Sequence, residues 1–212
     1  MTTAIQITGK SDSVRHLSSV DEKMKSLIQA IGTIEYQCGF TPYVFLVQTI
    51  IGQMLSNKAA DVITQRFEKL CGDTITPEIV SGLSVADLRS VGLSNSKAGY
   101  ILNLSECVLM EKLSFSALDT MPDAEVLRVL TALRGIGSWS AKMYLIFVLG
   151  REDILPYEDG AFLQAYSWLY QVKGPKPSEI IAACEKWHPY ASIASCYLYK
   201  ALDLGLTKGL PL

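Results

Sequence analysis

Apolar residues recur along most of this chain at the spacing of an α-helix. They fall at positions i, i+3, i+4 and i+7, which places them on one face and predicts amphipathic helices. Alternation typical of a strand occurs only weakly, in the first eight residues, so the chain is predicted to be all-α. The predicted helices are Asp21–Ile31, Tyr43–Leu55, Lys58–Leu70, Pro77–Gly82, Val85–Val91, Ser94–Met110, Asp123–Leu130, Ser138–Gly150, Gly160–Tyr170, Ser178–Lys186 and Ser192–Leu204.

Residues that favour helix starts support this reading. Thr41-Pro42, Thr76-Pro77 and Pro122-Asp123 each precede an apolar helical pattern, and Ser84 with Asp87 has the spacing of a capping box. The segment Lys173 to Pro177 is the clearest break, although it is too short to define a domain boundary. No repeat of fixed period is present.

Composition narrows the class of protein. With 212 residues, 49% of them hydrophobic, the chain can bury a large core in one or two domains. The N-terminus has no secretory apolar region and the apolar runs are too short to span a bilayer, so we expect neither secretion nor membrane insertion. The five scattered cysteines form no CxxC pair and are expected to be reduced, mostly buried thiols of the cytosol.

The net charge of −2 does not indicate a polyanionic partner, so nucleic-acid binding would depend on local residues. Two segments offer such chemistry. Gly135-Ile136-Gly137 forms a tight turn between two predicted helices, and the N–H groups that open the second helix favour an anion. The same turn can be a simple helix connector. Asp159 precedes another predicted helix, where an aspartate can be an N-cap, a catalyst or both.

Four segments in order resemble one family. IIGQMLSNKAA at 50–60, VGLSNSKAGYI at 91–101, the hairpin turn, and WHPY with ASCYLY at 187–199 resemble the helix-hairpin-helix superfamily of DNA base-excision glycosylases. The similarity is greatest to its alkylpurine (3-methyladenine) branch. It extends from about residue 43 to 200.

The resemblance implies a fold and an activity. It implies two helical subdomains, 44–150 and 1–43 plus 151–212, with a DNA-binding cleft between them. It implies a monofunctional glycosylase that flips alkylated purines out of double-stranded DNA and hydrolyses the N-glycosidic bond in base excision repair. The protein is expected to be a monomer, cytoplasmic or, in a eukaryote, nuclear.

Site residues follow by similarity. Asp159 matches the catalytic aspartate, which stabilises positive charge on the sugar and orients water, and Glu158 is a weaker alternative. Trp139, Tyr157 and Tyr199 would line the base pocket, where core packing is the competing reading. Residues expected to contact DNA are Gly135, Ile136, Gly137, Ser138, Trp139, Gln53, Ser56 and Met54, the last as a wedge that fills the gap of the flipped nucleotide unless it is a buried core methionine.

Cofactor expectations also come from the resemblance. The carbonyls of Thr131, Leu133 and Ile136 would hold a monovalent cation, Na⁺ or K⁺. No iron–sulfur cluster is expected, because closely spaced C-terminal cysteines are missing. Trp139 stands where bifunctional relatives carry the Schiff-base lysine, so no lyase activity is expected. Lys142, one turn on, is expected to be solvated or to face phosphate.

Departures from the family pattern leave rival readings open. Members commonly have glutamine at Met54, arginine at Ala191 and basic residues at Leu163 and Gln164, which implies weaker and less salt-dependent DNA binding here. A catalytically silent protein that binds abasic or distorted DNA is one alternative. A helical protein-interaction module is another, although it would leave the hairpin and Asp159 unexplained.

Overall fold

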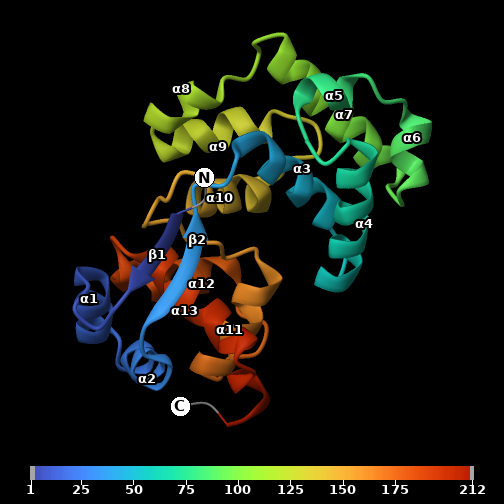
Figure 1. Cartoon of the computed structure of the whole chain (residues 1–212). Helices are drawn as coiled ribbons and strands as arrows, with labels where there is room; N and C mark the ends of the chain where they lie inside the picture. The colour runs from blue at the N-terminus through green and yellow to red at the C-terminus, as the bar shows by residue number, and fades with distance from the viewer. Residues whose placement is uncertain (1–2, 211–212) are drawn as a thin grey trace. The chain divides into compact units, whose positions relative to one another are not determined.

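The computed structural model describes residues 3–210, and these divide into two compact units. Phe40–Tyr144 form the first unit, and residues 3–39 with 145–210 form the second. Helices make up nearly all the regular structure of both (Figure 1). The predicted all-α class is therefore confirmed, with a single two-stranded sheet added in the described residues.

The first unit is a set of helices joined by short turns. Its apolar interior includes Leu46, Phe67, Leu104 and Tyr144, all buried. The predicted capping box is present at Ser84 and Asp87, whose side chains each accept the other's backbone N–H. The helices are α3 Pro42–Gly52, α4 Asn57–Leu70, α5 Pro77–Ser81, α6 Val85–Ser90, α7 Asn95–Leu109, α8 Phe115–Thr120, α9 Asp123–Thr131 and α10 Ser138–Phe147, which passes into the second unit.

The second unit combines both ends of the chain around one core. Trp187 and Phe162 lie fully buried at edge-to-face geometry within it. The two strands pair antiparallel, with Ile7 opposite Ile34. The elements are β1 Thr3–Ile7, α1 Asp12–Val20, α2 Glu22–Ile31, β2 Ile34–Cys38, α11 Gly160–Tyr170, α12 Pro177–Cys184, η1 Glu185–Trp187, α13 Ala191–Asp203 and η2 Leu206–Lys208.

The sequence pattern missed some elements and extended one too far. Helices α1 and α8 and strand β2 were not predicted. The helix predicted at Tyr43–Leu55 ends at Gly52, because Gln53 has a ψ of 129° and Met54 a left-handed φ of 57°, and neither angle occurs in an α-helix. The chain thus leaves the helix at the segment expected to contact DNA.

Four of the five cysteines are buried as free thiols, and Cys107 is partly exposed. Within residues 3–210, the helices are all too short or too polar to cross a bilayer.

Candidate functional site

The hairpin turn requires glycine at its first position. Gly135 has φ +86°, and a Cβ there would overlap the Cγ atom of Tyr100, far inside van der Waals contact. The next residue, Ile136, is buried and donates its N–H to the Leu133 carbonyl at 3.2 Å. Packing of the turn against α7 therefore determines its conformation.

The second glycine of the turn faces open space. A Cβ on Gly137 would meet nothing within 4 Å. Its carbonyl accepts the Ala141 N–H at 3.1 Å, so α10 begins here, and Gly137 and Ser138 are exposed. The first N–H groups of a helix have no intrahelical partner and carry partial positive charge, which suits a phosphate.

The loop after α3 is joined to the hairpin by a side chain. The Gln53 amide donates to the Gly135 carbonyl at 2.8 Å and lies 3.4 Å from the Ser140 hydroxyl. Met54, the next residue, is fully exposed at 101%. The reading of Met54 as a buried core methionine is therefore wrong. Ser56 is also exposed, and its hydroxyl caps α4 by accepting the Ala59 N–H at 3.4 Å.

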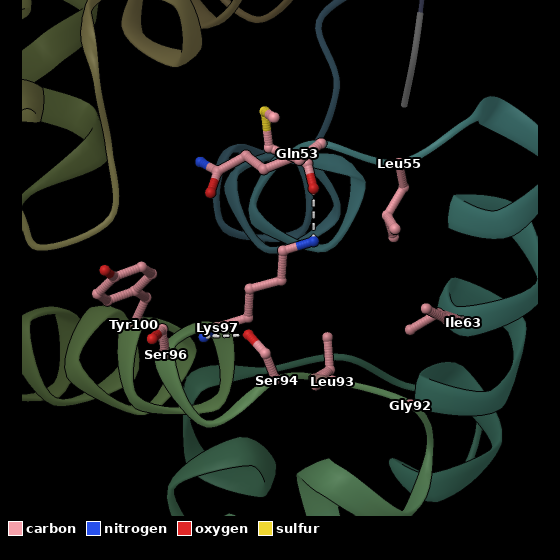
Figure 2. A pocket seen from close by; sticks show the side chains of 10 residues that line it. Gln53, Leu55, Ile63, Gly92, Leu93, Ser94, Ser96, Lys97 and Tyr100 are labelled. Atoms are coloured by element: carbon pink, nitrogen blue, oxygen red, sulfur yellow. Dashed lines mark hydrogen bonds between the residues drawn. The ribbon is translucent and has the colours of Figure 1, made fainter.

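A pocket of about 320 Å³ lies beneath this loop in the first unit. Figure 2 shows the Lys97 ammonium reaching from α7 to the Gln53 carbonyl across it. Apolar side chains, including Leu55 and Ile63, form one side, and the Ser94 and Ser96 hydroxyls lie on the other. The pocket adjoins the segment that carries Met54.

Asp159 is fixed as the N-cap of α11 in the second unit. One of its carboxylate oxygens accepts the Phe162 N–H at 2.7 Å, and Phe162 is fully buried. The Asp159 N–H donates to the Pro156 carbonyl at 2.9 Å. Side chain and backbone are thus both held. Asp159 is half-buried, whereas neighbouring Glu158 is exposed.

The loop that leads to Asp159 is attached to the start of α13. The Ser192 hydroxyl donates to the Arg151 carbonyl at 2.7 Å and accepts the Ile154 N–H at 2.9 Å. Asp153 accepts the Ala191 N–H at 3.2 Å. These bonds place the loop and α13 in a fixed relation.

Helix α13 also carries Tyr199. Burial, followed by the negative charge of Asp159, raises the pKa of Tyr199 well above its usual range, so these two groups lie close together. Tyr157 and Tyr199 both pack, partly buried, against the core of the second unit. They serve the packing of this unit whether or not they also contact a base.

The remaining candidates lie on the first two turns of α10. Trp139 is half-buried. Lys142 is only 7% exposed, so the expectation that it is solvated is wrong, whereas the alternative, that it faces phosphate, stays a prediction. The sequence did not reveal this burial because Lys142 sits within an apolar helix pattern, where a lysine is ordinarily assigned to the solvent side.

The ligands expected for a monovalent cation are the backbone carbonyl oxygens of Thr131, Leu133 and Ile136. The Leu133 carbonyl accepts one hydrogen bond, from Ile136, and a carbonyl oxygen has two lone pairs. Neutral oxygens of this kind suit a monovalent cation. In the described part of the chain no three His, Cys, Asp or Glu side chains gather as a metal site.

A family model for the HhH-GPD superfamily of base excision DNA repair proteins matches residues 47–189. The chain belongs to this superfamily. It is 30% identical over 193 residues to an alkylbase DNA glycosidase-like protein of Schizosaccharomyces pombe, covering 88% of this chain and 91% of the relative.

Solved structures agree with this membership. A DNA-3-methyladenine glycosidase from Bacillus halodurans has a TM-score of 0.84 at 32% identity, covering 95% of this chain and 94% of its own. A 3-methyladenine DNA glycosylase of S. pombe, in complex with abasic DNA, has a TM-score of 0.85 at 27% identity, covering 91% and 97%.

Two residues that contact the hairpin and the Met54 loop received no role from the sequence. Lys97 and Tyr100 lie in the segment 91–101 that matches the family, so the signal was present. Their spacing of three residues places them on one face of α7. Only the folded chain shows that this face meets Gly135 and Gln53.

Proposed function

We propose that this superfamily member is a DNA glycosylase that flips alkylated purines, of the 3-methyladenine kind, out of the duplex and hydrolyses their N-glycosidic bond. The observation that carries the proposal is Asp159, a carboxylate fixed at the start of α11 at the position that matches the family's catalytic aspartate. The relatives named as 3-methyladenine glycosylases support the same substrate class.

Asp159 would act by electrostatics and by orienting water. As the glycosidic bond breaks, positive charge grows on the sugar, and a fixed carboxylate stabilises it without reorganising. The carboxylate also orients the attacking water and accepts its proton. Alkylated purines already carry positive charge and leave easily. One carboxylate is then enough.

The chemistry proposed is monofunctional. A lyase needs an amine that attacks the sugar C1′, and the family's lysine position is occupied here by Trp139. An indole cannot form a Schiff base. Lys142 is 7% exposed on α10, which further disfavours it as the nucleophile. The product is therefore an abasic site in an intact strand.

Binding would use the exposed groups of the first unit. N–H groups around Gly135, Gly137 and Trp139 would contact phosphates, and such contacts carry no sequence information, as scanning requires. Met54 would enter the gap left by the flipped base, with Gln53 and Ser56 beside the opposite strand. We propose no required cofactor. The carbonyls of Thr131, Leu133 and Ile136 would hold Na⁺ or K⁺ if one binds the hairpin.

Trp139, Tyr157 and Tyr199 are the proposed pocket aromatics. An aromatic face stacks on a flipped base and attracts one that carries positive charge. We propose that the protein acts as a monomer, in the cytoplasm or, in a eukaryote, the nucleus.

The test is base release from methylated duplex DNA by the wild type and by Asp159→Asn. Loss of the carboxylate is expected to lower the rate by about 10²-fold or more with the fold retained. DNA affinity stays the same or rises, because a negative charge is removed. Glu158→Gln, one residue away and exposed, is the matched control and keeps its activity.

The same reactions report strand cleavage. The strand is expected to stay intact until alkali is added, and borohydride is expected to trap no protein–DNA adduct. A rate for Asp159→Asn within threefold of wild type contradicts the role of this residue. If the wild type binds abasic DNA but releases no base, the protein is the catalytically silent DNA-binding protein of the alternative reading.

A further inference from the structure

The first turn of α7 holds the loop that carries Met54. Lys97 donates from its ammonium to the Ile51 carbonyl at 2.8 Å. It also donates to the Gln53 carbonyl at 2.6 Å (Figure 2). These carbonyls belong to the end of α3, where the last carbonyls have no intrahelical donor and carry partial negative charge. A lysine there satisfies both oxygens with charge-assisted bonds.

Contacts of the Met54 side chain do not stabilise its left-handed backbone conformation. Its side chain is fully exposed, and its φ of 57° lies in the left-handed region that a non-glycine residue occupies at a cost of about 1 kcal/mol or more. The contacts that maintain this backbone must come from neighbours. A backbone bond from the Leu55 N–H to the Gly52 carbonyl at 3.1 Å closes the turn around Gln53 and Met54. The side-chain contact beside this turn is the Lys97 bond to the carbonyl of Gln53, the residue immediately before Met54.

The next turn of α7 supports the hairpin. The Tyr100 ring lies against Gly135, and the Gln53 amide donates to the Gly135 carbonyl at 2.8 Å. Lys97 therefore contacts Gln53, Gln53 contacts Gly135 and Gly135 contacts Tyr100, and α7 carries both Lys97 and Tyr100. The Met54 side chain projects from this group of residues into solvent. The exposed start of α10 comes three residues after Gly135.

We propose that Lys97 is a positioning residue, which fixes Met54 in its projecting conformation so that this side chain can enter the DNA duplex. The inference rests on the proposed function in one respect, the role of Met54 as a wedge. The new element is the contact that holds Met54 in place. Burial lowers the pKa of Lys97. The two carbonyls offset that cost only while the loop keeps this shape.

The test uses Lys97→Met, which keeps most of the side-chain length and removes the donor. Base unstacking is followed by 2-aminopurine fluorescence in a duplex with the fluorophore beside an abasic-site analogue. We expect the equilibrium constant for unstacking at saturating protein to fall by about tenfold or more, because two charge-assisted bonds are lost. Affinity for undamaged duplex is expected to change less than threefold, because the hairpin remains.

Two controls isolate the position and the donor. Lys112→Met makes the same change on an exposed lysine beyond the other end of α7 and is expected to match the wild type. Lys97→Arg keeps a donor and is expected to recover part of the signal. Equal unstacking by Lys97→Met and Lys112→Met overturns the proposal.

A double-mutant cycle distinguishes positioning from general stability. If Lys97 acts through Met54, the loss caused by Lys97→Met disappears in a Met54→Ala background, whereas independent effects add. Additive losses overturn the proposal. Should Lys97→Met not fold, Lys97→Gln, which keeps one donor group, enters the cycle in its place and must show the same non-additivity.

Failure of the proposed function gives a different result. Unstacking at an abasic analogue needs no catalysis, so it is measured whether or not the protein releases a base. A wild type without base release but with Met54-dependent unstacking removes the glycosylase assignment and leaves the role of Lys97 intact. If the wild type releases a base and Met54→Ala leaves unstacking unchanged, the role of Lys97 is contradicted and the glycosylase assignment stands.

Discussion

Two glycines of one turn serve different purposes. Gly135 has φ +86°, and Tyr100 fills the space where its Cβ would stand. Gly137 has nothing within 4 Å of that position. The fold of the protein therefore explains the first glycine, whereas the second is free of packing constraints and is explained by the phosphate contact that we propose at the start of α10.

This difference predicts opposite behaviour for two substitutions. Gly137→Val is expected to keep its thermal midpoint within a few degrees and to weaken DNA binding at least about tenfold, because a β-branched side chain blocks close approach of the backbone to phosphate. Gly135→Ala is expected to lower the midpoint, since its Cβ displaces the Tyr100 ring. Circular dichroism melts and fluorescence anisotropy with a labelled duplex measure both. Unchanged DNA binding by Gly137→Val would make the turn a structural connector only.

For single residues, the sequence predicted local roles such as helix capping better than it predicted burial. It placed Asp159 before a helix, and the structure has that aspartate as the N-cap of α11. It expected Lys142 to be solvated or to face phosphate, and Lys142 is buried. The reason is that exposure depends on contacts between distant segments, whereas capping depends on residues three positions apart. The Lys97 contact with Gln53 joins residues 44 apart, beyond any local pattern.

One buried carboxylate connects three elements of the second unit. Asp21, 4% exposed, caps α2 by accepting the Lys23 and Met24 N–H groups. Its other oxygen accepts the Tyr170 hydroxyl at 2.6 Å and the Trp187 indole N–H at 3.0 Å. The Lys186 ammonium is 3.0 Å away. Burial alone would raise the pKa of Asp21, but these donors outweigh it and the pKa is lowered.

Asp21→Asn is therefore expected to cost about 3 kcal/mol of unfolding free energy, because a buried ion pair loses one partner and an amide cannot accept every bond. The native pKa of Asp21 lies below the unfolded value of 3.8, so its stabilisation is complete above that pH and is lost as the pH falls through the native pKa. Urea unfolding at pH 7 and below pH 3.8 measures both effects, and the difference between variant and wild type shrinks in acid. Asp12→Asn, an exposed aspartate of α1, is the control. A loss below 1 kcal/mol at pH 7 contradicts the role of Asp21.

At element scale the helices with a long apolar stripe were predictable, and the others were not. Helix α1 is only nine residues long and buries only Ser13, Val14 and Leu17, so it offers too few apolar positions to establish a helix from the sequence alone. Strand β2 has a buried residue only at each end, Ile34 and Cys38. Its pairing with β1 depends on segments that helices separate in the sequence. Tertiary packing stabilises such elements more than local propensity does.

For the whole molecule, charge limits how DNA can be held. The chain has 19 Lys and Arg against 21 Asp and Glu residues, so its net charge is −2. A protein of this charge cannot attract DNA by a general positive field. The proposed grip instead uses N–H groups at the hairpin, which bind phosphate without neutralising it by a full charge. Few counterions are then released on binding.

Binding is accordingly expected to depend only weakly on salt. The slope of log K against log salt concentration is expected to be shallower than about −3, since each neutralised phosphate contributes about −0.9. Gln164→Arg restores a basic residue where family members commonly carry one, on the exposed start of α11, and is expected to steepen the slope by about 0.9 and raise affinity. Gln29→Arg, also exposed, on α2, adds the same charge elsewhere and is expected to leave the slope nearly unchanged. Titrations at several salt concentrations with one duplex measure all three proteins.

A wild-type slope near −6 would mean that lysines and arginines, and not the backbone of the hairpin, provide most of the DNA contacts. Equal steepening by both arginine variants would mean that overall charge matters and the start of α11 does not face DNA.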